Sequence, residues 1–295
     1  MYKNSIVIDV KTHPYLFTEI CQTQEDCDFA IQTTGLLHSG PYAANNSFSK
    51  MNVANIDKAV LSPLDLTTAK GRWMATNEQT AEMVEKYPDR FFAFASVDPN
   101  REDAADVLEK AFSDLKLKGL HLFPALQQFS PDDEKMEKIY DICEHYDVPV
   151  LFDAGCSPYP RLSTKYAHPL LLEDVALNRK NLRICISRFA WPWVREVCML
   201  MLKCHNVYTD TSFVYLDNPK EMYRQTFTSE MGPKWIERGF RHQVMFGSGS
   251  PGLEQIRMAE AIYNMDWREG TIENVMGKNA LEFMGIEKDM RWLND

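Results

Sequence analysis

The sequence predicts a (β/α)₈ TIM barrel, an α/β fold in which eight parallel strands form a central barrel surrounded by helices. Two observations support this prediction. Short apolar runs recur eight times along the 295 residues, and helical patterns lie between them. The main rival is a doubly wound open sheet, which has the same alternation of strand and helix. Eight strands within this chain length favour the barrel.

The eight apolar runs are mostly continuous, as expected for parallel strands that are buried on both faces. In chain order they are SIVIDV (5–10), KAVLSPL (58–64), RFFAFASV (90–97), LKGLHLF (117–123), VPVLFDA (148–154), LRICIS (182–187), NVYTDTSF (206–213) and HQVMFGS (242–248).

Three helical segments between the strands illustrate the pattern. The segment 77–87 places apolar residues among charged ones, which is typical of a helix with one buried face. The segment 131–146 begins with a proline and acidic residues, the favoured composition of a first helical turn. The segment 193–204 is largely apolar and predicts a mostly buried helix.

One long stretch departs from this alternation. Residues 14–57 separate the first two strands and contain TGLLHSGPYAANNSFS, which is too long for a plain connection. We interpret 14–57 as a partly helical lid, inserted after strand one, over the barrel mouth. A second irregular stretch, 157–169, follows the fifth strand. Both follow the C-terminal ends of strands, where barrel enzymes carry their active sites. With no internal repeat, the prediction is a single domain, 1–295.

The composition is that of an ordinary globular protein, with 45% hydrophobic and 25% charged residues. The net charge of −10, without a long Lys/Arg-rich run, argues against nucleic acid and anionic membranes as partners. No stretch approaches the ~20 apolar residues of a membrane helix, and the N-terminal segment lacks a signal-peptide pattern. Seven cysteines without a C-x-x-C motif are typical of reduced thiols. These features predict a cytoplasmic location.

The first apolar run leads into IDVKTHP (8–14), where Lys11 and His13 lie on the same face of the predicted strand. Later phrases follow in order: YPDRFFAFASVDP (87–99), KGLHLFP (118–124), VLFDAG (150–155), NLRICISRFAWPW (181–193), NVYTDTS (206–212), VMFGSGSP (244–251) and ENVMGKNALEFMGI (273–286). The series resembles the amidohydrolase superfamily, in particular its amidohydrolase-related group of decarboxylases, lactonases and hydrolases of aromatic or pyrone acids. The resemblance runs from residue 6 to about 286 and implies an amidohydrolase-like TIM barrel.

In that family a divalent metal is held by two histidines of strand one, by histidines of strands five and six, and by an aspartate of strand eight. The resemblance places at these five positions Lys11, His13, Asp153, Arg188 and Gly249. Only His13 retains the family's residue. His121 stands where the family's strand-four motif has a lysine.

The exchanged residues are unsuited to a metal dication, which needs electron-pair donors. Lys11 and Arg188 bring positive charges instead, and arginine stays protonated. We therefore expect no metal and no other cofactor, with the Lys11 ammonium near the place of the missing metal. Two cations introduced together with Asp153 favour a functional site. The alternative is a structural ion-pair cluster of Lys11, Asp153 and Arg188 that plugs the barrel mouth, because deeply buried charges have to be paired.

His13 is a candidate general base, since its pKa range suits proton transfer near neutral pH. The alternative is a remnant that hydrogen-bonds Asp153. His121 lies one strand period from Gly119, so it should face the same lumen and help bind substrate, unless it is only a satisfied core histidine. Arg188 is a candidate clamp for a substrate carboxylate.

Gly249 removes the aspartate that accepts the proton in the family. Asp153 or His13 would therefore have to move the proton, while Lys11 and Arg188 hold the anion or the developing oxyanion. We expect Lys11, His13, Asp153 and Arg188 to converge in one pocket at the C-terminal end of the barrel, with His121 on its wall.

Three functions fit these residues. The first is a metal-independent enzyme that hydrolyses or decarboxylates a small carboxylated, aromatic or pyrone-like substrate. The second is a catalytically inactive relative that serves as a binding protein or as the partner subunit of an active paralogue. The third is a rearranged metal site of His13, His121 and Asp153, which Lys11 and Arg188 in the same lumen oppose. We favour the first. The expected partner is a small carboxylate, and a homo-oligomer or a hetero-oligomer with the paralogue stays open.

Overall fold

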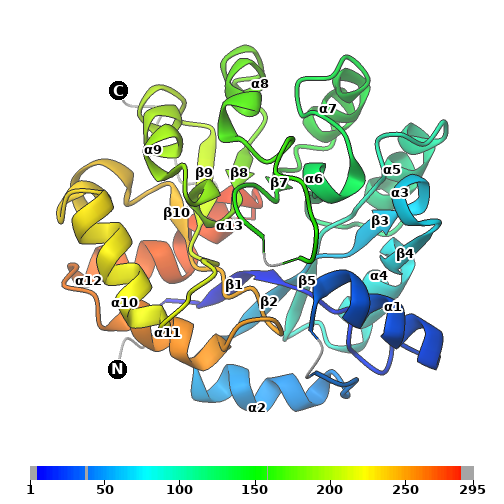
Figure 1. Ribbon diagram of the computed structural model, residues 1–295, viewed down its shortest axis with the longest axis horizontal. Helices are drawn as coiled ribbons and strands as arrows, with labels where there is room; N and C mark the ends of the chain where they lie inside the picture. The colour runs from blue at the N-terminus through cyan, green and yellow to red at the C-terminus, as the bar shows by residue number, and fades with distance from the viewer. Residues whose placement is uncertain (1–4, 37–38, 158, 287–295) are drawn as a thin grey trace.

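The computed structural model describes residues 5–36, 39–157 and 159–286 and shows strands at the centre of a ring of helices (Figure 1). Within these residues, the parallel strands of the barrel are β1 (Ile8–Thr12), β2 (Lys58–Leu61), β5 (Phe91–Ala93), β6 (Leu120–Leu122), β7 (Val150–Phe152), β8 (Ile184–Ile186), β9 (Val207–Asp210) and β10 (Val244–Met245). Each overlaps one of the eight predicted runs.

The strands close into a barrel through two seams. One set pairs in the order β1–β2–β5 and the other in the order β10–β9–β8–β7–β6, all in parallel. Between β5 and β6, the Ala95 backbone N donates to the Gly119 carbonyl at 2.7 Å. Between β1 and β10, the Val10 N donates to the Phe246 carbonyl at 3.0 Å. These seams confirm the predicted TIM barrel and exclude the open sheet.

The helices surround this barrel. They are α1 (Gln24–Thr34), α2 (Asn45–Val53), α3 (Thr67–Lys70), α4 (Asn77–Lys86), α5 (Ala104–Ser113), α6 (Pro124–Gln127), α7 (Met136–His145), α8 (Glu173–Asn178), α9 (Val194–Lys203), α10 (Pro219–Arg224), α11 (Gln255–Tyr263), α12 (Glu269–Glu273) and α13 (Asn279–Phe283). Short 3₁₀ segments are η1 (Pro169–Leu172) and η2 (Ser187–Ala190), and π segments are η3 (Gln225–Glu230), η4 (Ile236–Phe240) and η5 (Asn274–Lys278). None of the helices in the described ranges has the length and hydropathy of a transmembrane segment.

The predicted helices differ from the structure mainly at one boundary. α4 and α9 match the segments 77–87 and 193–204 closely. α7 begins at Met136, so the expected start near residue 131 is wrong. The Asp133 carboxylate accepts the backbone N–H of Ser130 at 3.0 Å, which holds the preceding residues in a turn.

A short antiparallel hairpin was not predicted. It consists of β3 (Leu64–Leu66) and β4 (Arg72–Ala75), joined by α3. The sequence gives little sign of it because β3 follows β2 after only two residues, within one apolar run.

The stretch 14–57 contains α1 and α2, so its partly helical character is confirmed. α2 packs against α11, and Phe48 of α2 contacts Phe91 at the start of β5, with ring centroids 5.6 Å apart. Phe91 lies at the N-terminal end of its strand, so this half of the stretch lies along the side of the barrel. The lid role stays a prediction, and residues 37–38 of the stretch lie outside the described residues.

The barrel interior is apolar at its base. Alternating residues of several strands, including Val10, Leu151 and Tyr208, form a buried cluster with α13. Phe283 of α13 contacts Tyr208, with ring centroids 5.2 Å apart, and so closes the N-terminal end. Lys11 follows Val10 and Asp153 follows Leu151 toward the C-terminal ends of their strands, so charged side chains lie on that side of the cluster.

Candidate active site

A charged layer lies directly above the apolar base. The Lys11 Nζ atom lies 2.6 Å from Asp153 Oδ2 and 2.8 Å from His121 Nε2, and these last two atoms are 2.7 Å apart. Lys11 and His121 are completely buried, and Asp153 is 1% exposed. The predicted inward direction of His121 is thus confirmed. Gly247 provides the room, since a Cβ atom there would meet Lys11 Cβ at 3.0 Å.

The protonation of this layer follows from its partners. His121 Nδ1 lies 2.7 Å from the Pro63 carbonyl, which can only accept, so Nδ1 carries the hydrogen and Nε2 faces the ammonium. Burial and then the Lys11 charge lower the pKa of His121. Burial acts to raise the pKa of Asp153, but Lys11 and Arg188 outweigh it and hold that pKa well below its usual range. Asp153 is therefore an ionised partner for two cations.

Arg188 reaches this carboxylate from a strained backbone segment. Arg188, Phe189 and Ala190 have φ angles of 50°, 51° and 44°, which non-glycine residues adopt rarely. Asp210 Oδ1 accepts the Arg188 backbone N–H, and Thr209 Oγ1 accepts that of Phe189, both at 3.0 Å. Such strain persists only where its surroundings enforce it, and it is typical of functional sites.

The Arg188 guanidinium is only partly engaged. Its Nη2 donates to Asp153 Oδ1 at 2.6 Å and its Nη1 donates to the Ala154 carbonyl at 3.4 Å, whereas its buried Nε has no partner within the part of the chain that the structure describes. Burial acts to lower the pKa of Arg188, but Asp153 and Asp210 raise it overall, so the group stays charged. Arg188 therefore retains a donor for a further acceptor.

A cavity of about 260 Å³ lies over the charged layer. Of the predicted site residues, His13 and Arg188 line it, and Gly249 does as well. The remaining lining residues come from four regions of the chain: Tyr15, Thr34, Gly35, Leu36, Ser157, Tyr159, Ser212, Val214, Pro251, Gly252 and Leu253. The stretch 14–57 and the irregular stretch after strand five thus both border it, as expected for a barrel mouth.

The structure separates the predicted site residues into two groups. His13 and Arg188 border the cavity, while Lys11, His121 and Asp153 form a closed cluster beneath it. The five residues lie close together. Because Lys11 and His121 are buried beneath the cavity, this arrangement does not support their predicted contact with a substrate. Their charges act on the cavity through Arg188 and His13.

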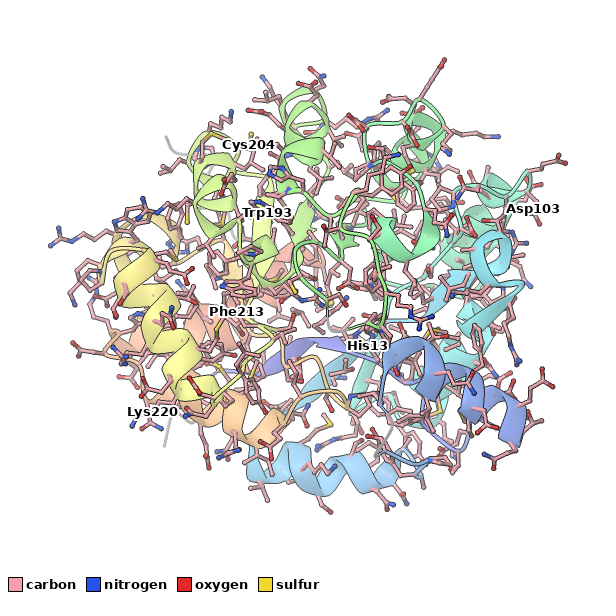
Figure 2. All side chains as sticks on the ribbon, in the orientation of Figure 1. His13, Asp103, Trp193, Cys204, Phe213 and Lys220 are labelled. Carbon is pink, nitrogen blue, oxygen red and sulfur yellow. The ribbon has the colours of Figure 1, made fainter. Side chains whose placement is uncertain are left out.

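His13 lies just after β1, near the centre of the view in Figure 2. Its ring stacks against Tyr15 with centroids 4.9 Å apart and lies 5.9 Å from the His121 ring. Its buried Nδ1 has no hydrogen-bond partner among residues 5–36, 39–157 and 159–286, so this atom does not tie the ring to Asp153. Burial and then the Lys11 charge hold the pKa of His13 well below 6.5. The imidazole is therefore neutral at physiological pH and able to accept a proton.

Two tyrosines of the cavity were missed by the sequence analysis. Tyr15 follows the IDVKTHP phrase directly, and Tyr159 lies in the irregular stretch after strand five. The proximity of Tyr15 to His13 along the chain was the one available signal. The extended strand ends at residue 12, so the direction of residue 15 could not be derived from strand alternation.

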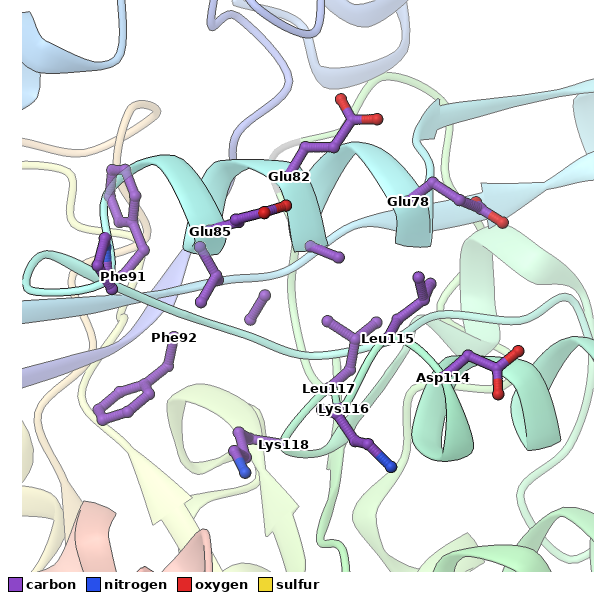
Figure 3. Close-up of a pocket in the computed structure, with 14 residues that line it drawn as sticks. Glu78, Glu82, Glu85, Phe91, Phe92, Asp114, Leu115, Lys116, Leu117 and Lys118 are labelled. Carbon is purple, nitrogen blue, oxygen red and sulfur yellow. The ribbon is translucent and has the colours of Figure 1, made fainter.

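A second cavity, of about 520 Å³, lies elsewhere (Figure 3). It is bordered by Glu78, Glu82 and Glu85 of α4 and by residues 114–118. Phe91 begins β5 and Lys118 precedes β6, so this groove lies at the N-terminal ends of the strands. None of the predicted site residues lines it, whereas His13 and Arg188 line the cavity above the charged layer, which is therefore the candidate active site.

The described residues contain no group of three or more His, Cys, Asp or Glu side chains that could hold a metal ion. In particular, the rearranged site of His13, His121 and Asp153 is not formed. The Lys11 Nζ contacts both His121 Nε2 and Asp153 Oδ2, the two atoms that such a site would need.

Asp9 supports the charged layer from behind. Its carboxylate accepts the backbone N–H groups of Lys11 and Ser248, at 3.2 and 2.8 Å, and the side chains of Ser248 and Gln255, at 2.6 and 2.8 Å. Asp9 is completely buried, and burial raises its pKa from 3.8 to about 6 despite these bonds. The folded protein therefore binds a proton at Asp9 more tightly than the unfolded chain does.

This raised pKa predicts a pH dependence of stability. The stabilising contribution of the Asp9 proton is complete below the unfolded-state pKa and is lost as pH rises to about 6. The wild type should therefore lose stability as pH rises from 3.5 to 7, whereas Asp9→Asn does not titrate at this position. Over this range the unfolding free energy of the variant should increase by roughly 3 kcal/mol relative to that of the wild type. Urea unfolding of both proteins across this range measures the difference. A difference independent of pH would contradict the assignment.

Comparison with family models gives a match to the amidohydrolase model over residues 8–286. A search of curated proteins gives no significant match. Among solved structures, an uncharacterised TIM-barrel protein of Bordetella bronchiseptica is similar, with a TM-score of 0.74 and 19% identity over 95% of this chain and 98% of that one.

Two enzymes of known activity are also similar in structure. The dihydroxybenzoic acid decarboxylase of Polaromonas sp. JS666, solved with manganese and 2-nitroresorcinol, gives a TM-score of 0.71 at 16% identity, covering 96% of this chain and 98% of that one. The 5-carboxyvanillate decarboxylase of Sphingomonas paucimobilis gives 0.65 at 14% identity, covering 96% and 99%. At such identities the likeness establishes the fold alone.

Proposed function

The chain belongs to the amidohydrolase family, and from this premise we propose that it is a metal-independent enzyme for a small carboxylated substrate with an aromatic or pyrone-like ring. The reaction is hydrolysis or decarboxylation. One observation carries the proposal: a cavity of about 260 Å³ at the C-terminal ends of the strands, with a charged arginine and a neutral histidine on its wall. Its size suits a ligand smaller than a typical drug molecule.

The family's divalent metal does not fit the residues of this site. Manganese accompanies the Polaromonas decarboxylase, but here the ammonium of Lys11 contacts Asp153 Oδ2 at 2.6 Å and His121 Nε2 at 2.8 Å. An ammonium has no lone pair to offer, and a dication beside it and Arg188 would meet two positive charges. The positive charge of the site comes instead from these two side chains.

The neutral His13 supports hydrolysis more strongly than decarboxylation. In hydrolysis, His13 takes a proton from water, and the resulting hydroxide adds to the carbonyl carbon of a pyrone-like cyclic ester, whose carbon–oxygen bond then breaks. The leaving oxygen receives the proton back from His13. Decarboxylation instead requires a group that is already protonated when the reaction starts and can give its proton to a ring carbon, and His13 starts unprotonated. The decarboxylase activity of the two similar structures keeps this second reaction in the proposal.

Replacing Arg188 with alanine should weaken the binding of a carboxylated ligand by about 2 kcal/mol or more, roughly 30-fold, because a charge-assisted pair is lost. Arg188→Lys should restore only part of this affinity, since the planar fork is lost. Thermal shift with aromatic, pyrone and short-chain dicarboxylic acids identifies the ligand, and calorimetry then measures its affinity.

The matched control is Arg195→Ala, which removes an equal charge from the exposed side of α9. It should leave binding unchanged, because an exposed charge is screened by salt. If no acid stabilises the wild type, or if Arg188→Ala binds as well as Arg195→Ala, the carboxylate site is absent.

Protein expressed in metal-supplemented medium should carry no stoichiometric zinc, iron or manganese. Elemental analysis of the purified chain checks this. About one metal ion per chain, lost on changing His13, His121 or Asp153 to alanine, would instead establish the rearranged metal site and overturn metal independence.

The second candidate function is a catalytically inactive relative that binds ligands or an active paralogue. The complete pairing of Lys11 in a closed cluster favours it, because this cation is not available to a substrate. A ligand that binds without turnover would support this alternative. A cytoplasmic location, and an oligomer with itself or with the paralogue, stay proposals from the sequence.

A further inference from the structure

Several buried polar atoms have no hydrogen-bond partner among the described residues, and three of them belong to residues that line the cavity: His13 Nδ1, Tyr15 Oη and Arg188 Nε. Native folds seldom leave a buried polar group unpaired, because its desolvation is then uncompensated. Their gathering around one cavity indicates that a ligand completes their hydrogen bonding. The proposed function uses Arg188 and His13 but leaves Tyr15 without a role.

The Tyr15 hydroxyl is held firmly in place. The side chain is 1% exposed, and its ring stacks on His13 at an interplanar angle of 22°. The Tyr15 carbonyl accepts the Cys21 thiol at 2.9 Å, which fixes the backbone behind it. Burial, and then the charges of Tyr159 and Asp153, raise the pKa of Tyr15 well above 10. The hydroxyl therefore stays protonated and can both donate and accept a hydrogen bond.

Another hydroxyl of the cavity is already engaged. Ser212 Oγ donates to Asp210 Oδ1 at 2.5 Å, within the network that holds the strained segment of Arg188. Tyr15 differs because its hydroxyl has no partner among the described residues. The Tyr15 hydroxyl is therefore available to hydrogen-bond a ligand and does not stabilise the fold through a hydrogen bond of its own.

We propose that Tyr15 determines the specificity of this site by hydrogen-bonding a second oxygen of the ligand, a hydroxyl or carbonyl oxygen on the ring that carries the carboxylate. The inference rests on the proposed function, since Arg188 is taken to hold the carboxylate. An acid without the second oxygen leaves Tyr15 unpaired in the complex. A site with such a buried polar group discriminates strongly against the analogue that lacks its partner.

The test compares benzoate with 2-, 3- and 4-hydroxybenzoate by calorimetry, on the wild type, Tyr15→Phe and Tyr146→Phe. At least one hydroxybenzoate should bind the wild type 10-fold or more tightly than benzoate does. In Tyr15→Phe this ratio should fall to about 1, with benzoate affinity kept. Tyr146→Phe removes a tyrosine hydroxyl outside the cavity, one that donates to Glu109 Oε2 at 2.7 Å, and should keep the wild-type ratio. Without ligand, Tyr15→Phe should unfold at the same temperature as the wild type or higher.

The outcomes are distinguishable. If benzoate binds but no hydroxybenzoate gains affinity, or if Tyr15→Phe keeps the wild-type ratio, the role of Tyr15 is overturned and the carboxylate site stands. A lower unfolding temperature of Tyr15→Phe without ligand would show that the hydroxyl has a partner in the fold, which also overturns the proposal. If none of the four acids binds the wild type, the inference falls together with the proposed function.

Discussion

Replacing Asp153 with alanine is expected to lower the free energy of unfolding by about 3–5 kcal/mol, the cost of breaking a buried ion pair. The carboxylate is 1% exposed and lies 2.6 Å from both Lys11 Nζ and Arg188 Nη2. Its removal takes away the carboxylate that both cations contact, and leaves Lys11 and Arg188 close together in the barrel. Urea unfolding measures the loss.

Two further variants separate the charge from the shape of Asp153. Asp153→Asn keeps the volume but removes the charge, so it should destabilise the fold nearly as much as alanine does. Lys11→Met leaves the carboxylate paired with Arg188, so its cost should be clearly smaller. A loss below about 1 kcal/mol for Asp153→Ala, the scale of an exposed pair, would contradict a buried ion-pair cluster.

The barrel could be predicted from the sequence because each strand is a separate apolar run. Burial on both faces is a strong local signal, and it does not depend on distant residues. The hairpin β3–β4 and the start of α7 depend on side-chain contacts instead, such as that of Asp133 with the Ser130 backbone. Such contacts leave no periodic pattern, so the sequence alone did not reveal them.

The sequence predicted which residues come together at the site. It did not predict that three of them lie beneath the cavity and two border it. Strand positions place Lys11, His121 and Asp153 at one end of the barrel, and their mutual contacts follow from opposite charges in a narrow lumen. The depth of Lys11 depends on the shift of the β1 register between Asp9 and Thr12, an irregularity that cannot be derived from strand periodicity. The orientation of Arg188 depends on three successive residues with a left-handed backbone conformation. None of the three is glycine, so the sequence gives no signal of this conformation.

The ion-pair plug and the functional site were opposed as alternatives, yet the structure contains features of both. Lys11 and Asp153 are paired as a plug requires. Arg188 shares the same carboxylate but also borders the cavity with an unpaired Nε. The closed cluster of Lys11, His121 and Asp153 therefore supplies fixed charges beneath the cavity. The residues that border the cavity would carry out the proposed chemistry.

Replacing His13 with asparagine should reduce kcat by roughly 10²–10⁴-fold on the substrate that the acid screen identifies, the usual contribution of a general base. KM should change little, because Arg188 still binds the carboxylate. Steady-state kinetics of the purified variant measures both constants. His145→Asn, on the exposed face of α7, is the matched control and should keep the wild-type kcat. A His13→Asn variant with more than about a tenth of the wild-type kcat would exclude His13 as the base.

The pH profile tests the same assignment and gives Lys11 a measurable role. A base must be unprotonated, and burial together with the Lys11 charge holds the pKa of His13 well below 6.5. Activity should therefore persist below pH 6.5 and fall only when the pH approaches that lowered pKa. Lys11→Met removes a charge that lowers this pKa, so the acid limb of the profile should move to higher pH. A purely structural lysine would leave the limb in place, whereas a shift identifies Lys11 as a positioning residue that acts through His13.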